Sequence, residues 1–311
     1  MVLDAQQVAA MSERMLILSD GRAGHENQSV ALAKHLGMAY DICRVKPRFG
    51  WSKAAALLLD RAGVKLAGLF HIENPPQSVY SYVVGAGSTT YYPVKVLAKK
   101  LDAKSVAMML PKGFRYDFDL ILAQGHDDPP KQPNIKTLPV NLSYVQPQGI
   151  FQKAQKPVVG IVIGGENDTY TMSKGRIEAY LDEITVRYKE SHTIAVTTSP
   201  RTPKEIEALV ASYGFDYTLI YSECQENPIP DFLAVAEVVF VTADSTSMIS
   251  EAVSFGKSAI IVLPLEAQKE SKHQNFIEML ERGEYLHIYD GSVKYRTRKV
   301  DLSHILKKVF S

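Results

Sequence analysis

Apolar runs alternate along the chain with segments whose apolar residues recur at helical spacing. Val238–Thr242 is a continuous apolar, β-branched run, which is typical of a parallel strand buried on both faces. Small polar residues at 244–247 follow it, as at the start of a helix, and Gly256 is typical of that helix's end. Residues 258–263 form a second apolar run. The stretch therefore predicts a strand, a loop, a helix and a parallel strand.

The same alternation continues through the rest of the chain. Further strands are predicted at residues 15–18, 40–45, 79–84, 106–110, 119–123, 136–142, 157–163, 193–198, 217–221 and 286–289. Helices are predicted at residues 28–36, 51–59, 91–101, 172–188 and at the C-terminal end. Strands that alternate with helices favour an α/β fold with open, doubly wound parallel sheets.

A break in this pattern predicts two domains. Residues 146–156 contain Pro147 and Gly149 and then a polar, charged run, which is typical of an interdomain linker. We therefore expect one Rossmann-like domain at residues 1–148 and a second at residues 149–311. The last helix is expected either to cap the second domain or to pack back on the first.

Composition narrows the class of protein. A net charge of +1 gives no electrostatic reason to expect a nucleic-acid partner. The two cysteines, Cys43 and Cys224, are far apart, which favours a thiol-reducing compartment. Residues 1–13 lack the pattern of a signal peptide, and no apolar run is long enough to span a membrane. We expect a cytoplasmic protein, with peripheral contact at the inner face of the membrane left open.

The helix predicted after residue 246 is a candidate anion site. Ser245, Thr246 and Ser247 lie where the strand ends and the helix begins, so the positive end of the helix dipole favours a diphosphate there. Glu251, one turn further along, could accept hydrogen bonds from two vicinal ribose hydroxyls. The alternative is an ordinary capped helix with a solvated Glu251.

Glycine-rich loops mark the first half of the chain. Gly21 and Gly24 permit tight turns, and His25 follows them at the predicted junction of strand and helix, where a base could reach a hydroxyl. A histidine that merely caps the turn is the alternative. The loop at residues 85–89 could bind phosphate or an acceptor, although close packing also explains its glycines. Residues 126–130 (HDDPP) favour a solvated turn over a metal site, and no metal site is predicted.

Several segments resemble known families. The segments SDGRAGHENQ, GAGS, GHDDP, SPRTP and VTADSTSMISEA resemble those of the mitochondrial-fission (elongated-mitochondria, ELM-type) family, which is related to glycosyltransferases. STSMISEAVSFGKSAIIVLP, followed by KESKHQN, resembles the donor-binding segment of GT-B glycosyltransferases, particularly the lipid-linked N-acetylglucosaminyltransferase of peptidoglycan synthesis. These resemblances imply a GT-B-like fold, in which two Rossmann-like domains face an interdomain cleft. They also imply that residues 1–148 form the acceptor-side domain and residues 149–311 the nucleotide-sugar-binding domain.

The resemblance also implies roles for individual residues. His25 takes the place of the histidine in the GxGGH loop of the peptidoglycan enzyme, although SDGRAGH departs from that glycine pattern. Arg201 and Lys272 are candidates for stabilising the charge of the leaving diphosphate. The implied nucleotide-sugar-binding residues are Gly164, Gly165, Ser245, Thr246, Ser247, Glu251, Gln274 and Asn275. The candidate acceptor-side loop residues are Gly21, Gly24, Gly85, Gly87 and Ser88.

These features lead to one principal hypothesis and two alternatives. The principal one is a metal-independent, inverting transfer of a sugar from a nucleoside-diphosphate sugar to a hydroxyl of a glycan or lipid-linked acceptor, with no cofactor beyond the donor. A nucleotide-sugar epimerase or hydrolase would turn over without an acceptor. A non-catalytic interaction protein related to mitochondrial-fission factors would bind no nucleotide sugar.

Overall fold

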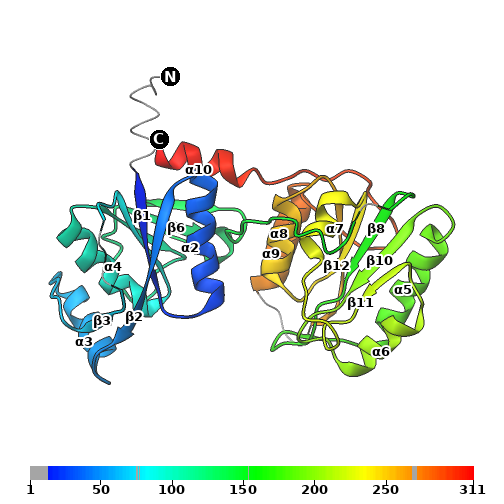
Figure 1. Cartoon of the computed structure of the whole chain (residues 1–311), viewed down its shortest axis with the longest axis horizontal. Coiled ribbons are helices and arrows are strands. Elements are labelled where there is room, and N and C mark those ends of the chain that lie inside the picture. Colours follow the sequence, from blue (N-terminus) through cyan, green and yellow to red (C-terminus); the bar gives the residue numbers. More distant parts are fainter. Residues whose placement is uncertain (1–12, 75, 77, 153, 268–271) are drawn as a thin grey trace. The chain divides into compact units, whose positions relative to one another are not determined.

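The structure is a computed structural model, and it describes residues 13–74, 76, 78–152, 154–267 and 272–311. The expectation that the chain has no signal peptide rests on residues 1–13, of which the structure describes only Glu13. Residues 269–271 of the KESKHQN segment also lie outside the described residues. The chain divides into two compact units (Figure 1). The first unit contains residues 1–144 and 302–311, and the second contains residues 145–301.

The first unit is built on one sheet, in the strand order β3-β2-β1-β4-β5-β6-β7. All its neighbouring strands are parallel except β2 and β3, which are antiparallel. The strands are β1 (Arg14–Ser19), β2 (Ala39–Pro47), β3 (Phe70–Ile72), β4 (Tyr82–Ala86), β5 (Lys104–Met108), β6 (Leu120–Gln124) and β7 (Ile135–Leu138). The helices are α2 (Ala23–Leu36), α3 (Ser52–Arg61), α4 (Ser88–Leu101) and α10 (Leu302–Phe310), with the 3-10 turn η1 at Gly125–Asp127.

The second unit has a parallel sheet in the order β11-β10-β8-β12-β13-β15 and a small antiparallel pair of β9 with β14. Its strands are β8 (Val158–Val162), β9 (Tyr170–Thr171), β10 (Thr193–Thr197), β11 (Tyr217–Leu219), β12 (Val238–Thr242), β13 (Ala259–Leu263), β14 (Glu266–Ala267) and β15 (His287–Ile288). Its helices are α5 (Lys174–Tyr188), α6 (Lys204–Ser212), α7 (Ile229–Val235), α8 (Thr246–Ser254) and α9 (Lys272–Arg282).

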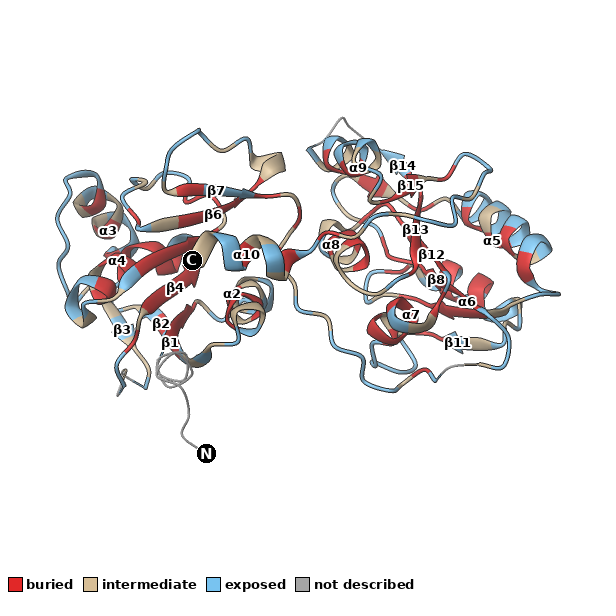
Figure 2. Cartoon of the chain, turned by 90° about the horizontal axis from the view of Figure 1, so that it is seen from above, coloured by how far each residue is buried: buried red, intermediate tan, exposed pale blue. Residues whose placement is uncertain are grey.

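The apolar runs fill the interior of each sheet. Every residue of β8, β12 and β13 is buried, as continuous β-branched runs require when helices cover both faces of a parallel sheet. Figure 2 shows the same contrast, with buried strands and helices that are exposed on their outward sides. The predicted α/β class with two doubly wound, Rossmann-like units is therefore confirmed.

Each sheet has one place where the strand order changes direction. In the first unit the chain moves from β1 outward to β2 and later starts again on the other side with β4. In the second unit it moves from β8 to β10 and β11, and then starts again with β12. Crevices form outside the carboxyl ends of the strands at such switch points, so these two edges are the natural ligand sites of the fold.

Some element boundaries differ from the sequence predictions. Helix α2 begins at Ala23 instead of residue 28, because the Arg22 carbonyl already accepts hydrogen bonds from the amides of His25 (3.0 Å) and Glu26 (3.1 Å). Strand β4 covers Tyr82–Ala86 instead of 79–84, because it pairs in register with β5. The short strands β3, β9 and β14 were not predicted.

The C-terminal helix α10 belongs to the first unit, where it packs on α2. His35 of α2 shares a hydrogen bond of 2.9 Å with the Ser303 hydroxyl, and the rings of Tyr82 and Phe310 lie 5.2 Å apart. Leu302 and Leu306 supply the buried face of α10. The units meet in the sequence at residues 144 and 145, against the predicted 148 and 149.

Candidate functional site

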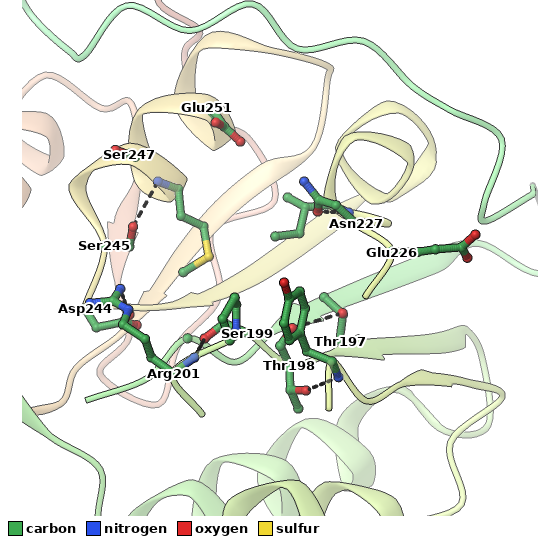
Figure 3. Close-up of a pocket in the computed structure, with 15 residues that line it drawn as sticks. Thr197, Thr198, Ser199, Arg201, Glu226, Asn227, Asp244, Ser245, Ser247 and Glu251 are labelled. Carbon is green, nitrogen blue, oxygen red and sulfur yellow. Dashed lines mark hydrogen bonds and ion pairs between the residues drawn. The ribbon is translucent and has the colours of Figure 1, made fainter. Parts of the chain in front are cut away.

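The second unit contains a cavity of about 330 Å³ at the switch point of its sheet (Figure 3). Its walls come from the segments that follow the carboxyl ends of β8, β10, β11 and β12, and from the first turns of α8. The lining residues are Gly164, Thr197, Thr198, Ser199, Pro200, Arg201, Tyr221, Glu226, Asn227, Ile229, Asp244, Ser245, Ser247, Met248 and Glu251. Of the predicted residues, the fold thus brings Gly164, Arg201, Ser245, Ser247 and Glu251 to one cavity.

Glu251 has the most unusual environment in this cavity. Its carboxylate has no hydrogen-bond or ion-pair partner among the described residues, and burial raises its pKa to about 7. Glu251 is partly buried, and its carboxylate loses part of its hydration without gaining a partner in the protein, which makes the charged form unfavourable. The side chain is therefore less hydrated than the alternative of a solvated Glu251 assumes. A ligand that donates hydrogen bonds would satisfy it.

Asp244 and Arg201 form an ion pair at the floor of the cavity. The Arg201 Nη2 atom lies 3.2 Å from Asp244 Oδ2, and the Asp244 side chain is fully buried while that of Arg201 is half exposed. Burial raises the pKa of Asp244, although the amide of Gly165, the hydroxyl of Thr242 and Arg201 act in the opposite direction. Arg201 is thereby held at the cavity, with part of its guanidinium open to an anion.

Gly164 and Gly165 have a packing role beside this pair. The Gly164 amide donates to the Thr242 hydroxyl (2.7 Å), and the Gly165 amide donates to Asp244 Oδ2 (3.0 Å). A Cβ atom on Gly164 would lie 1.9 Å from Asp244 Oδ1, and one on Gly165 would lie 2.2 Å from the Arg201 backbone. Both amides are engaged within the protein, so the glycines let the chain pass close to Asp244 instead of offering their amides to a phosphate.

The N-terminus of α8 opens into the cavity. The Ser245 hydroxyl caps the helix by accepting a hydrogen bond from the Met248 amide (3.3 Å), which identifies Ser245 as the N-cap residue. Ser247 is exposed in the first turn and lines the cavity, while Thr246 begins the helix without lining it. Gly256 follows the helix with φ +71°, as predicted for its C-terminal glycine.

The remaining predicted donor residues lie elsewhere in the second unit. Gln274 of α9 lines a smaller, mainly apolar cavity of about 140 Å³, together with Tyr170 and residues of β13 and β15. Asn275 is exposed and lines neither cavity. Lys272 is exposed at the start of α9 and also lies outside both cavities.

The switch point of the first unit carries an aspartate–histidine pair. The Nδ1 atom of His25 lies 3.0 Å from Asp20 Oδ2, and the Asp20 side chain is buried whereas that of His25 is 21% exposed. A carboxylate at this position favours the tautomer with hydrogen on Nδ1, which leaves the Nε2 lone pair available. Within the described part of the chain, no residue hydrogen-bonds Nε2. The geometry is that of an oriented general base.

The acceptor-side glycines have distinct positions around this pair. Gly21 has φ +83° and makes the turn after β1, whereas Gly24 lies inside α2 and not in a loop, contrary to expectation. Gly87 has φ +87°, and a Cβ atom there would lie 2.5 Å from the His25 ring. Gly85 belongs to β4, where a Cβ atom would collide with Thr90 and Val94. Ser88 is the first residue of α4 and is exposed.

Sequence reasoning missed several residues of both switch points. Asp20 is not among the candidate residues predicted from the sequence, although a carboxylate five residues before a histidine, across a strand-to-helix turn, is well placed to orient it. Asp244 was counted among the helix-capping residues but pairs with Arg201. Tyr221 and Asn227 come from a loop with no motif, so no signal in the sequence pointed to them.

Two further observations bear on the sequence-based expectations. Among the described residues, no three histidine, cysteine, aspartate or glutamate side chains are grouped as metal ligands, and Asp127 of the HDDPP segment pairs with Lys112 at 2.6 Å. None of the described helices is both long enough and apolar enough to cross a membrane.

Comparison with solved structures gives distant matches. The structure of MurG from Acinetobacter baumannii is 13% identical, with a TM-score of 0.47, and the match covers 96% of this chain and 89% of that one. The UDP-GlcNAc 2-epimerase of Methanocaldococcus jannaschii, solved with UDP-GlcNAc and UDP, is 12% identical with a TM-score of 0.46. That match covers 96% of this chain and 98% of the epimerase.

Comparison of sequences gives a relative and a family. The uncharacterized protein RP120 of Rickettsia prowazekii (strain Madrid E) is 24% identical over 322 aligned positions, which cover 89% of this chain and 90% of the relative. The model of the mitochondrial fission ELM1 family matches residues 23–304, a segment that includes both switch points except Asp20 and the turn that precedes α2. The chain therefore belongs to the mitochondrial fission ELM1 family.

Proposed function

We propose that the chain binds a nucleoside-diphosphate sugar in the cavity of the second unit and transfers the sugar to an acceptor hydroxyl. In this proposal Glu251 accepts hydrogen bonds from the ribose hydroxyls, and the N-terminus of α8 with Arg201 receives the diphosphate. His25, oriented by Asp20, takes the proton of the attacking hydroxyl. No cofactor beyond the donor is part of the proposal.

The observation that carries the proposal is the unpaired Glu251 carboxylate beside the helix terminus. The α8 dipole favours an anion, while Glu251 disfavours one and favours a donor of hydrogen bonds. A ligand for this cavity therefore needs a negative group and, about one helical turn away, neutral hydroxyls. A ribose linked to a diphosphate has both groups in that order.

The chemistry assigned to each side chain is limited and specific. Direct displacement at the sugar carbon breaks its bond to the diphosphate and forms a bond to the acceptor oxygen, so configuration is inverted. The acceptor proton passes to Nε2 of His25, and Asp20 stabilises the imidazolium that forms. The negative charge that develops on the diphosphate is stabilised by the α8 terminus and by Arg201.

The test is a binding screen followed by substitution of Glu251. Nucleoside diphosphates and their sugars are screened for a rise in the thermal unfolding temperature, since a ligand that binds only the folded state stabilises it. Glu251→Ala is expected to weaken binding of the best ligand by about 10- to 100-fold, the effect of one charge-assisted hydrogen bond or slightly more. Glu226→Ala removes the same charge at an exposed position of the same cavity and is the matched control.

The outcomes separate the proposed function from its alternatives. If wild type and Glu251→Ala bind ribose and 2′-deoxyribose ligands with the same affinity, Glu251 does not bind the ribose hydroxyls. Turnover of the donor without an acceptor would indicate an epimerase or hydrolase. No stabilisation by any nucleotide would favour a non-catalytic interaction protein.

A further inference from the structure

An exposed apolar and basic surface lies on and around α3 of the first unit and contains none of the residues assigned to the donor or the base. Its apolar side chains are Phe49 (48% exposed), Trp51 (59%), Leu58 (66%), Val64 (39%) and Leu66 (53%). Its exposed basic side chains are Arg48, Lys53, Arg61 and Lys65. We call these nine residues the α3 surface.

The helix presents its apolar side chains on its outward face. Trp51 precedes α3, and Leu58 and Arg61 follow it by seven and ten residues, a spacing that places the three on the same side of a helix. The inward side is formed by the buried residues Ser52, Ala56 and Asp60. Phe49 stacks on Trp51, with ring centroids 5.2 Å apart and planes 5° apart, so the two aromatic rings form one exposed unit.

The backbone that carries the surface is fixed by buried groups. Asp60 accepts a hydrogen bond from Lys95 of α4 (2.6 Å) and another from the Arg115 amide (2.7 Å). The buried Tyr92 hydroxyl accepts a hydrogen bond of 2.8 Å from the Leu66 amide and so holds the loop after α3. These contacts fix the backbone of α3 and of the loop that follows it. The exposed apolar side chains therefore stay in contact with solvent instead of folding back against the first unit.

The charge of the segment is strongly one-sided. Residues 44–68 contain six lysines and arginines and a single acid, Asp60, in a chain whose net charge is +1. That acid is turned inward and neutralised by Lys95. Arg48 and Arg61 make no ion pair with any described residue, so positive charge lies beside the exposed apolar side chains on the outward side of α3.

We infer that the α3 surface docks on the surface of an anionic lipid bilayer. Exposed tryptophan, phenylalanine and leucine enter the boundary between headgroups and acyl chains, and the surrounding lysines and arginines are attracted to anionic headgroups. The inference does not depend on the proposed function, since none of these residues lines the cavity of the second unit.

The test uses the full chain with lipid vesicles, and Trp51 is the reporter because it is the only tryptophan of the sequence. Vesicles of phosphatidylcholine are compared with vesicles that also contain phosphatidylglycerol. With anionic vesicles, the protein is expected to co-sediment, and the Trp51 emission is expected to shift to shorter wavelength and to be quenched by lipids brominated on their acyl chains. Added salt is expected to reverse most of the binding.

Two kinds of substitution test the two parts of the surface. Leu58→Glu is expected to weaken vesicle binding by about tenfold or more, because it removes apolar contact and adds a charge that anionic lipid repels. Arg61→Ala removes one positive charge from the outward side of α3 and is expected to weaken binding by about fivefold. Val186→Glu is the matched control, since Val186 is an 87% exposed apolar residue on α5 of the second unit.

Three results would overturn the inference. The first is an unchanged Trp51 emission with anionic vesicles at low salt. The second is an equal loss of binding in Leu58→Glu and Val186→Glu. The third is a shift of the Trp51 emission that increases with protein concentration in the absence of lipid and is absent in Leu58→Glu. That result would identify the surface as a contact between two copies of the chain.

Discussion

Glu251 shows how one side chain links the free energy of unfolding to ligand binding. Its pKa is raised by burial from an ordinary 4.5 to about 7, so between these pH values the folded chain holds a proton that the unfolded chain has lost. The stability associated with this proton is present in full below about pH 4.5 and is lost as the pH rises to about 7.

We therefore predict that Glu251→Gln stabilises the unliganded protein at pH 8 relative to wild type. The gain is expected to be on the order of 1–3 kcal/mol, and it should disappear at pH 4.5, where both side chains are neutral. Chemical denaturation at a series of pH values measures it. A stability difference that stays constant with pH would mean that the Glu251 carboxyl is not desolvated.

Binding is predicted to have the opposite pH dependence. Ribose hydroxyls donate hydrogen bonds best to the ionised carboxylate, so affinity for a nucleoside-diphosphate sugar should rise as the pH increases from about 5.5 to 8, with release of a proton. Calorimetry in buffers with different ionisation enthalpies detects that proton. The dependence should be absent in Glu251→Gln and with a 2′,3′-dideoxyribose ligand.

The Asp20–His25 pair leads to a kinetic prediction. His25→Ala is expected to reduce turnover by roughly 10²–10⁴ with donor affinity nearly unchanged, because only proton transfer is lost. Asp20→Asn keeps the size of the side chain but removes its charge, and an intermediate loss is expected.

Donor calorimetry and initial rates with an identified acceptor measure both variants. Near wild-type turnover in His25→Ala would exclude His25 as the base and direct attention to Glu26, which accepts a hydrogen bond from Ser19. A joint loss of stability and donor affinity would mean that the histidine only holds the turn after β1.

The two serines at the start of α8, which the sequence analysis treated alike, have different environments in the structure. Ser245 caps the helix, whereas Ser247 is exposed at the cavity and caps nothing. Ser245→Ala is expected to lower the free energy of unfolding by about 1 kcal/mol, and Ser247→Ala by less than about 0.5 kcal/mol. Ser247→Ala should instead weaken binding of a diphosphate, and thermal unfolding with and without ligand distinguishes the two effects.

The length and polarity of each element decided how well it could be predicted from the sequence. Buried runs such as β12 were located to the residue, because continuous burial leaves a continuous apolar run. The start of α2 was placed too late, because no described side chain caps it and Gly24 in a helix is atypical. The strands β3, β9 and β14 have two or three residues each, too few for a period to be recognised.

Local pattern alone predicted the candidate site where strand, loop and helix are adjacent in the sequence, whereas Gly164 and Arg201 were candidates only through the resemblance to glycosyltransferases and the charge that a diphosphate needs. Ser245, Ser247 and Glu251 belong to one such segment, and all three reach the cavity. Arg201, Tyr221 and Asn227 reach it because β10 lies beside β8 and β11 lies beside β10, an order that no local pattern contains. The position of Gln274 in a separate cavity likewise depends on how α9 packs.

The chain as a whole interleaves its two units, because it leaves the first at residue 144 and returns to it at Leu302. We predict that removal of residues 302–311 destabilises the first unit selectively, since α2 loses the contact of His35 with Ser303 and the apolar cover of Leu306. Hydrogen exchange should accelerate in α2 and β1, and exchange in β8, β12 and β13 should stay unchanged. Equal acceleration in both units would contradict this prediction.

The same return of the chain sets an order of events during synthesis on the ribosome. Residues 145–301 are contiguous and can fold as soon as they emerge, whereas the first unit is completed only by α10, which is translated after them. Until then the face of α2 that α10 covers stays open to chaperones and to other nascent chains. A chain released before Leu302 would carry a complete second unit on a first unit without its last helix, so quality control of this protein is expected to act on the first unit.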